Sequence, residues 1–165
     1  MMKIRRFFGS MVAIGTLTVA LPAENQALAA PSTEHLDARA EPLSTLTADV
    51  TQLAVYGPTA RGLRVDVAFK GTLHGHINGI MEGIDYSTIR ADGTTEINVH
   101  AKITTQDQAL ISVEIQGVLV NGQVSDTSVR FLTAAAQYAY LQDKIVIGKG
   151  IATTEKLAIK YFLVQ

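Results

Sequence analysis

The sequence of 165 residues contains no cysteine. This absence excludes disulfide bonds, thiolate metal sites, cysteine nucleophiles and a lipid anchor on an N-terminal cysteine. Aromatic residues make up only 6% of the chain and charged residues 18%, whereas 47% of the residues are hydrophobic. Such a composition is typical of one ordinary globular domain, and without disulfides that domain must be stabilised by its core.

The sequence also has no excess of basic residues, with 14 Lys and Arg against 15 Asp and Glu. The absence of a Lys/Arg cluster argues against nucleic acid as a partner and against binding to an anionic membrane surface. There is no G-x-S-x-G motif, no glycine-rich phosphate loop before a helix and no paired-carboxylate motif. Hydrolase and nucleotide-binding functions therefore lack support, and we expect no cofactor.

The first residues have the order of a secretory signal peptide. They begin with three basic residues, continue with an uncharged apolar run from residue 7 to 23, and end in the cleavage pattern Ala27-Leu28-Ala29. The run is shorter than the roughly 20 residues needed to span a bilayer. We therefore predict a signal peptide over residues 1–29 and an exported protein, periplasmic or secreted, with no membrane contact after cleavage. An uncleaved membrane anchor is the alternative.

The remaining chain shows the period of β-strands. Residues 30–42 are polar and small, and we predict that they form a flexible leader. From residue 43 onward, apolar and β-branched residues alternate in short runs that turn residues separate about every ten positions. The runs predict about nine strands, over residues 43–55, 63–70, 76–82, 85–90, 94–104, 110–120, 124–132, 138–147 and 156–164.

The turn residues connect consecutive strands as hairpins. "ADG" (91–93) and "NG" (121–122) contain glycines that accept a positive φ angle, and "QDQ" (106–108) turns the central hairpin. Consecutive strands are then antiparallel neighbours, and nine are enough to close a barrel. We therefore predict that residues 43–165 form a single antiparallel up-and-down β-barrel.

The central hairpin has one polar face. Asn98, His100 and Lys102 alternate with apolar residues on its first strand, and Ser112, Glu114 and Gln116 do so on its second. In a β-sandwich this polar face would be the outer surface. In a barrel with a ligand cavity it could equally line the lumen. His100 beside Glu114 is the best acid-base candidate, because a neighbouring carboxylate raises the basicity of a histidine and orients its ring. An ordinary exposed pair is the alternative.

Two histidines, His74 and His76, lie on one face of a predicted strand with Glu82 nearby, as in some metal sites. No third histidine motif follows downstream. We expect these histidines to be exposed at the junction of a strand and a turn, and we predict no metal site.

The segment "GIDYSTIRADG" (83–93) is similar to the motif G-x-D-W-x-x-x-R-x-D-G of the family known as domain of unknown function 3237. Asp85, Arg90, Asp92 and Gly93 are in register, and Tyr86 takes the place of the tryptophan. Three further segments are similar in order and spacing, namely "YGPTARGLR" (56–64), "GTLHG" (71–75) and "RFLTAAAQYAYLQDKIVIGKG" (130–150). The resemblance extends from about Leu46 to the C-terminus. It implies a calycin-type (lipocalin-like) antiparallel barrel and brings no established activity.

The sequence departs from the family pattern at charged positions. Asn98 and His100 stand where the family has aspartate and arginine, and Leu132 stands where it has glutamate. The chain is therefore identified as a divergent member of the family. These replacements favour a binding function over an activity that uses the charged network.

Two residue groups have both a functional and a structural interpretation. Asp85, Arg90 and Asp92 form a ligand clamp if the carboxylates hold the planar guanidinium, or they only stabilise a hairpin and its turn. Tyr138 and Tyr140, two positions apart, supply stacking and a hydroxyl to a cavity, or they belong to the core.

Taken together, the sequence predicts an exported barrel whose lumen binds a small, partly apolar molecule. The residues that we expect to contact it are Asp85, Tyr86, Arg90, Asn98, His100, Tyr138 and Tyr140. One alternative is a cofactor-free isomerase, cyclase or lyase with His100 and Glu114 as base and acid. A structural or oligomerisation barrel is a second alternative, and a homo-oligomer is compatible with all three.

Overall fold

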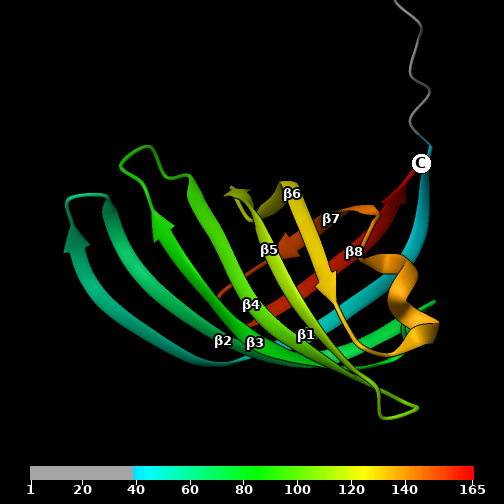
Figure 1. Cartoon of the computed structure of the whole chain (residues 1–165). Coiled ribbons are helices and arrows are strands. Elements are labelled where there is room, and N and C mark those ends of the chain that lie inside the picture. Colours follow the sequence, from blue (N-terminus) through cyan, green and yellow to red (C-terminus); the bar gives the residue numbers. More distant parts are fainter. Residues whose placement is uncertain (1–38) are drawn as a thin grey trace, which may run out of the picture. The chain divides into compact units, whose positions relative to one another are not determined.

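The computed structural model describes residues 39–165. The predicted signal peptide and nearly all of the predicted leader lie outside these residues. In the described part, eight strands form a closed antiparallel barrel in which each strand pairs with the next and β8 pairs with β1 (Figure 1). The strands are β1 (Ala40–Thr59), β2 (Gly62–Gly75), β3 (Gly79–Ile89), β4 (Thr95–Thr105), β5 (Leu110–Val120), β6 (Gln123–Leu132), β7 (Ile145–Ala152) and β8 (Lys156–Val164).

The predicted antiparallel barrel is confirmed, with one strand fewer than predicted. The two short strands predicted over residues 76–82 and 85–90 are a single strand, β3, because the backbone stays extended through Gly83. The strand predicted over residues 138–147 is wrong in its first half, which forms the 3-10 helix η1 (Ala136–Leu141). β1 begins at Ala40, so residues 40–42 belong to the barrel.

The barrel is held together by an apolar interior. Inward residues alternate with outward residues on each strand, and the inward ones include Phe69, Met81, Ile103 and Ile111, all less than 5% exposed. Each such side chain contributes about 1.5–3 kcal/mol by leaving water. The period-two pattern of the sequence is therefore the direct cause of the fold.

The two ends of the barrel differ. At one end, Leu141 of η1 is buried in the core, and Asp107 in the β4–β5 turn accepts hydrogen bonds from Gln137 (2.7 Å) and from the Tyr138 hydroxyl (3.2 Å). At the other end lie the β1–β2, β3–β4, β5–β6 and β7–β8 turns, and the β1–β2 hairpin projects beyond the rest (Figure 1). No helix within residues 39–165 has the length and apolar character needed to cross a membrane.

Candidate functional site

The polar face of the central hairpin is the outer wall of the barrel. β4 and β5 pair in the predicted register, with His100 opposite Glu114 and Asn98 opposite Gln116. All four side chains are exposed, whereas the alternating apolar residues of the same strands are buried or partly buried. The placement of Asn98 and His100 in the lumen is therefore corrected, because the apolar face of this hairpin is the one that lines the interior.

Arg90 is separated from Asp85. Its guanidinium lies at the β3–β4 turn, 3.6 Å from the Asp92 carboxylate and 3.8 Å from that of Glu96, and it is exposed. Asp92 accepts a hydrogen bond from the backbone N–H of Thr94 (2.9 Å) and so stabilises its own turn. Among the described residues, no hydrogen bond or ion pair joins Arg90 to Asp85. The structural interpretation of Arg90 and Asp92 therefore holds, and the clamp does not form.

None of the three tyrosines predicted to bind the ligand lines the interior cavity, although Tyr138 packs against the core. Tyr138 and Tyr140 belong to η1 and not to a strand. The expectation that they lie on one face of a sheet, because they are two positions apart, is therefore wrong. Tyr138 is held by Asp107, and Tyr140 is 44% exposed. Tyr86 points outward, with its ring between the Arg64 guanidinium (5.3 Å) and the His100 ring (5.9 Å).

The interior holds a cavity of about 70 Å³ near the β5–β6 and β7–β8 turns. Its walls come from all strands of the barrel and are almost entirely apolar; they are Leu46, Val67, Phe69, Asp85, Ile97, Val99, Ile115, Val124, Thr127, Gly148, Ala152, Leu157, Ile159 and Tyr161. Among these lining residues, only Asp85 has a side chain of a type that is normally charged at neutral pH.

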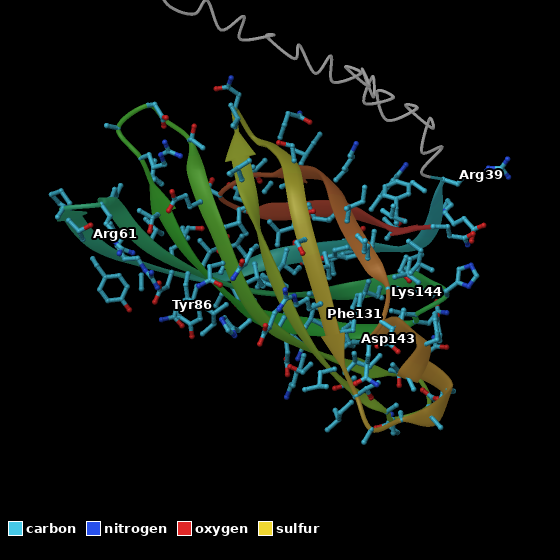
Figure 2. The ribbon with its side chains drawn as sticks, turned by 45° about the horizontal axis from the view of Figure 1, so that its top comes forward. Arg39, Arg61, Tyr86, Phe131, Asp143 and Lys144 are labelled. Carbon is cyan, nitrogen blue, oxygen red and sulfur yellow. The ribbon has the colours of Figure 1, made fainter. Side chains whose placement is uncertain are left out.

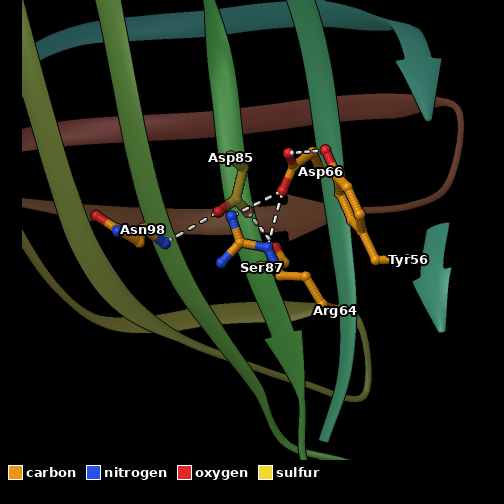
Figure 3. A network of polar contacts seen from close by, with 6 residues as sticks. All are labelled: Tyr56, Arg64, Asp66, Asp85, Ser87 and Asn98. Atoms are coloured by element: carbon orange, nitrogen blue, oxygen red, sulfur yellow. Dashed lines mark hydrogen bonds and ion pairs between the residues drawn. The ribbon is translucent and has the colours of Figure 1, made fainter. Parts of the chain in front are cut away.

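Asp85 reaches the lumen because it alternates with outward residues on β3. Met81, Gly83, Asp85 and Ser87 share the inward face of this strand. The ladder between β3 and β4 skips two residues on each strand after the pair Asp85–Val99. In this gap Asp85 Oδ1 accepts the backbone N–H of Asn98 (2.9 Å), and Oδ2 accepts the Ser87 hydroxyl (2.7 Å), as Figure 3 shows.

Burial raises the pKa of Asp85 above its ordinary value of 3.8. The hydrogen bonds from Ser87 and from the Asn98 N–H oppose this shift, because both stabilise the carboxylate, but burial dominates. An acid with a raised pKa in an apolar cavity can donate or accept a proton, and it can accept a hydrogen bond from a bound molecule through its remaining lone pairs.

Two further polar residues of the interior escaped prediction. Ser87 is 4% exposed and holds Asp85, and Thr127 is 5% exposed and bridges β6 to β7 through the backbone N–H and C=O of Gly148 (both 2.5 Å). Ser87 lies two residues after Asp85, so strand alternation could have placed both on one face. Thr127 lies within an irregularity of the β5–β6 register, between Ser125 and Ser128, which the alternation does not reveal.

A second polar group lies on the outer surface of the β1–β2 hairpin. Asp66 accepts hydrogen bonds from the Tyr56 hydroxyl (2.9 Å) and from Arg64 Nε (2.9 Å), as Figure 3 shows. The Arg64 guanidinium also covers the Tyr86 ring. The hydrogen bond to Asp66 raises the pKa of Tyr56. These side chains connect β1, β2 and β3 from outside and do not reach the cavity.

His74 and His76 are both exposed near the end of β2. Within residues 39–165, no three His, Cys, Asp or Glu side chains gather in a way that could hold a metal ion.

Comparison with solved structures gives the same fold. A conserved protein of unknown function from Rhodopseudomonas palustris is 21% identical, with a TM-score of 0.69 over 78% of this chain and 98% of that one. A β-barrel-like protein from Acinetobacter baumannii is 18% identical, with a TM-score of 0.70 over 78% and 96%. An enzyme from Penicillium herquei is 21% identical, with a TM-score of 0.62 over 78% and 95%.

No curated protein sequence matches the chain. The family model described as "Protein of unknown function (DUF3237)" matches residues 38–164, which include the whole barrel. The chain therefore belongs to the DUF3237 family.

Proposed function

We propose that the barrel binds a small, mostly apolar molecule in the interior cavity and that a hydrogen-bond donor of this molecule contacts Asp85. The observation that carries the proposal is the position of one carboxyl group in an otherwise apolar wall. Ligand sites typically combine an apolar lining with a few convergent polar groups. Burial makes the ionised form of this carboxyl costly, and such a cost is typical of functional positions.

The size of the cavity limits the ligand. A volume of about 70 Å³ is several times the roughly 10–15 Å³ that one water molecule needs, but it is well below the ~300 Å³ at which drug-sized pockets begin. The buried part of the ligand is thus about the size of a single ring.

Phenol and toluene are suitable probes, because they have the same ring and differ in one hydrogen-bond donor. We expect phenol to perturb the methyl NMR signals of Val67, Val99 and Ile115 in a saturable manner and more tightly than toluene. The difference should disappear in Asp85→Asn, because the neutral amide is a weaker acceptor than a carboxylate.

The matched control is Asp92→Asn, an exposed aspartate of the same sequence motif. It should leave the preference for phenol unchanged, and so should His100→Ala on the outer wall. Equal binding of phenol and toluene to the unmodified protein would contradict the proposed role of Asp85, and no binding of either would contradict a ligand cavity.

A second candidate is a cofactor-free enzyme that transfers a proton at Asp85, in place of the His100–Glu114 pair expected from the sequence. The raised pKa of Asp85 favours it, since general acids and bases work best when their pKa lies near the working pH. The similar protein from Penicillium herquei is described as an enzyme. The test is solvent deuterium exchange into the α-carbons of cyclopentanone, which Asp85 should accelerate and Asp85→Asn should not.

A further inference from the structure

Within residues 39–165, the second half of β1 has a free edge. β1 pairs with β8 only from Ala40 to Asp49, and the N–H of Val50 then donates to the carbonyl of Glu155 (2.7 Å) in the β7–β8 turn. From Gln52 to Thr59, β1 pairs with β2 alone among the described strands, so the projecting hairpin has no strand of the barrel on its other side (Figure 1). Such an edge presents backbone N–H and C=O groups that can pair with another strand.

This edge lacks the charged side chains that commonly protect a free edge from pairing, although Pro58 lies near its tip. The eleven residues "VTQLAVYGPTA" (50–60) include no Lys, Arg, Asp or Glu, although natural sheets commonly place charges on exposed edges. Large apolar side chains are exposed here, with Leu53 at 47%, Val55 at 66% and Tyr56 at 66%. Irregularities in the β1–β2 register, one between Val50 and Gln52 and one between Val55 and Gly57, leave a regular segment from Gln52 to Val55.

We propose that this edge binds the same edge of a second copy of the chain, antiparallel about a two-fold axis at Ala54. Residues that pair across such an axis point to the same face of the continued sheet. Ala54 then lies opposite Ala54 of the second copy, and Leu53 lies opposite Val55. Leu53 and Val55 share one face in this structure, since their partners on β2 are Val67 and Val65. The pairing therefore forms two apolar cross-strand contacts.

The charges around the edge favour this antiparallel orientation. Arg61 lies at the exposed tip of the hairpin (Figure 2), and the exposed acid Glu155 lies at its base beside Asp49, which pairs with Lys156 of the same chain (3.2 Å). An antiparallel pair brings the tip of each hairpin close to the base of the other, so Arg61 approaches Glu155 of the second copy. A parallel pair would instead place Arg61 beside Arg61 of the second copy. A strand of an unrelated protein has no reason to carry charges complementary to those at the tip and the base of this hairpin.

The absence of native cysteine allows a direct test with a single thiol. In Ala54→Cys, the two thiols of the pair belong to residues whose Cα atoms lie about 4.5–5.5 Å apart, which is within the range of about 4.4–6.8 Å that a disulfide requires. We expect most of the protein to become a disulfide-linked dimer in oxidised glutathione. Thr47→Cys is the control, because Thr47 is an exposed residue of the same strand with partners on both sides.

The result that supports the proposal is cross-linking of Ala54→Cys without cross-linking of Thr47→Cys, measured by mass under non-reducing conditions. If Ala54→Cys remains monomeric, or if both variants cross-link equally, the proposed axis is wrong.

The unmodified dimer is tested by sedimentation over a range of protein concentrations. Val55→Lys places two charges on the paired edge and should raise the dimer Kd at least about tenfold, while folding is retained because Val55 is exposed in the monomer. Ile151→Lys is the matched control, since Ile151 is 50% exposed on β7. A protein that is monomeric at about 100 µM, or a Val55→Lys variant that still dimerises, would overturn the proposal.

The orientation has its own test. Arg61→Glu should raise the dimer Kd about three- to tenfold, because two symmetric exposed contacts are lost and each exposed ion pair is weak. Adding Glu155→Arg should restore much of the affinity. A loss that Glu155→Arg does not restore would contradict the antiparallel arrangement.

Discussion

Glu82 and Asp85 lie three residues apart on β3 and face opposite sides of the barrel wall. Glu82 points outward between two lysines, 3.0 Å from Lys70 Nζ and 2.9 Å from Lys102 Nζ, and these hydrogen bonds lower its pKa. Asp85 points inward, where burial raises its pKa. The same chemical group is therefore easier to ionise on one face of the wall and harder to ionise on the other.

The comparison shows what the two faces of the wall can do. An exposed carboxylate between lysines is solvated and screened by salt, so it contributes little to stability and has no cavity in which to act. A carboxyl in the apolar interior is costly to ionise, and it faces a space that a small molecule can fill. Function in this barrel is therefore expected on the inner face, where polar residues are few.

The largest effect is expected from Gly83, which lies between the two carboxylates. A Cβ at this position would lie 2.5 Å from the Cβ of Ala101 and 2.5 Å from the carbonyl oxygen of His100. β3 and β4 would have to separate, which also disturbs the neighbouring Asp85. Gly83→Ala should therefore lower the free energy of unfolding by about 3 kcal/mol, as overpacked cores do, when measured by urea denaturation.

Gly93→Ala is the control for the Gly83 prediction. The open turn at Gly93 has no atom within 4 Å of an added Cβ, so the cost there comes from the positive φ angle of 84° alone. If Gly83→Ala is as stable as Gly93→Ala, the close approach of β3 and β4 at Gly83 is not needed for their pairing.

The next effect in size concerns the hydrogen bonds of Asp85. Asp85→Ala removes the acceptor of the Asn98 N–H and the Ser87 hydroxyl, and each unpaired polar group in the wall costs about 1–3 kcal/mol. Asp85→Asn keeps an acceptor oxygen and removes the charge. We expect Asp85→Ala to be less stable than Asp85→Asn by about 2 kcal/mol in chemical denaturation. Equal stability of the two variants would mean that Asp85 has no structural part in the gap of the β3–β4 ladder.

Much of this arrangement follows from the sequence. Period-two alternation gave β5 and β8 with their observed ends and placed His100 opposite Glu114. Alternation also shows that Asp85 and Ser87 share a face. It does not show which face of a hairpin is inside, because that depends on how the sheet closes. The polar face of β4 and β5 was the more conspicuous group of side chains, although the barrel turns it outward.

The rest was set by local geometry that alternation does not record. Tyr138 and Tyr140 have the spacing of one strand face, but the chain there forms η1 and fastens to Asp107. Arg90 and Asp85 belong to one motif, yet the four residues of extended chain between them place Arg90 at a turn and Asp85 in the interior. The clamp was inferred from residues that are close in sequence, and they do not meet in the structure. Thr127 could not be found in this way, because its partner Gly148 lies on another strand.

A smaller effect should appear in the pH dependence of stability. A pKa raised on folding means that the native state binds the Asp85 proton more tightly than the unfolded chain does. The resulting stabilisation is complete below the ordinary pKa of 3.8 and is lost as the pH rises through the raised value. Compared with Asp85→Asn, the unmodified protein should therefore lose stability between about pH 4 and neutral pH. A difference between them that stays constant with pH would contradict the raised pKa.

The smallest effect is expected at Glu82, and its sign is opposite. Its pKa is lowered on folding, so its stabilising effect is present above the ordinary value of 4.5 and is lost as the pH falls through the lowered value. Glu82→Gln should lower the midpoint of thermal unfolding only slightly at pH 7 and low salt. The difference should vanish at 1 M NaCl, where the Debye length is about 3 Å, because this carboxylate is on the solvated face. A salt-independent loss would show that Glu82 is as enclosed as Asp85, and the contrast between the two faces of β3 would fail.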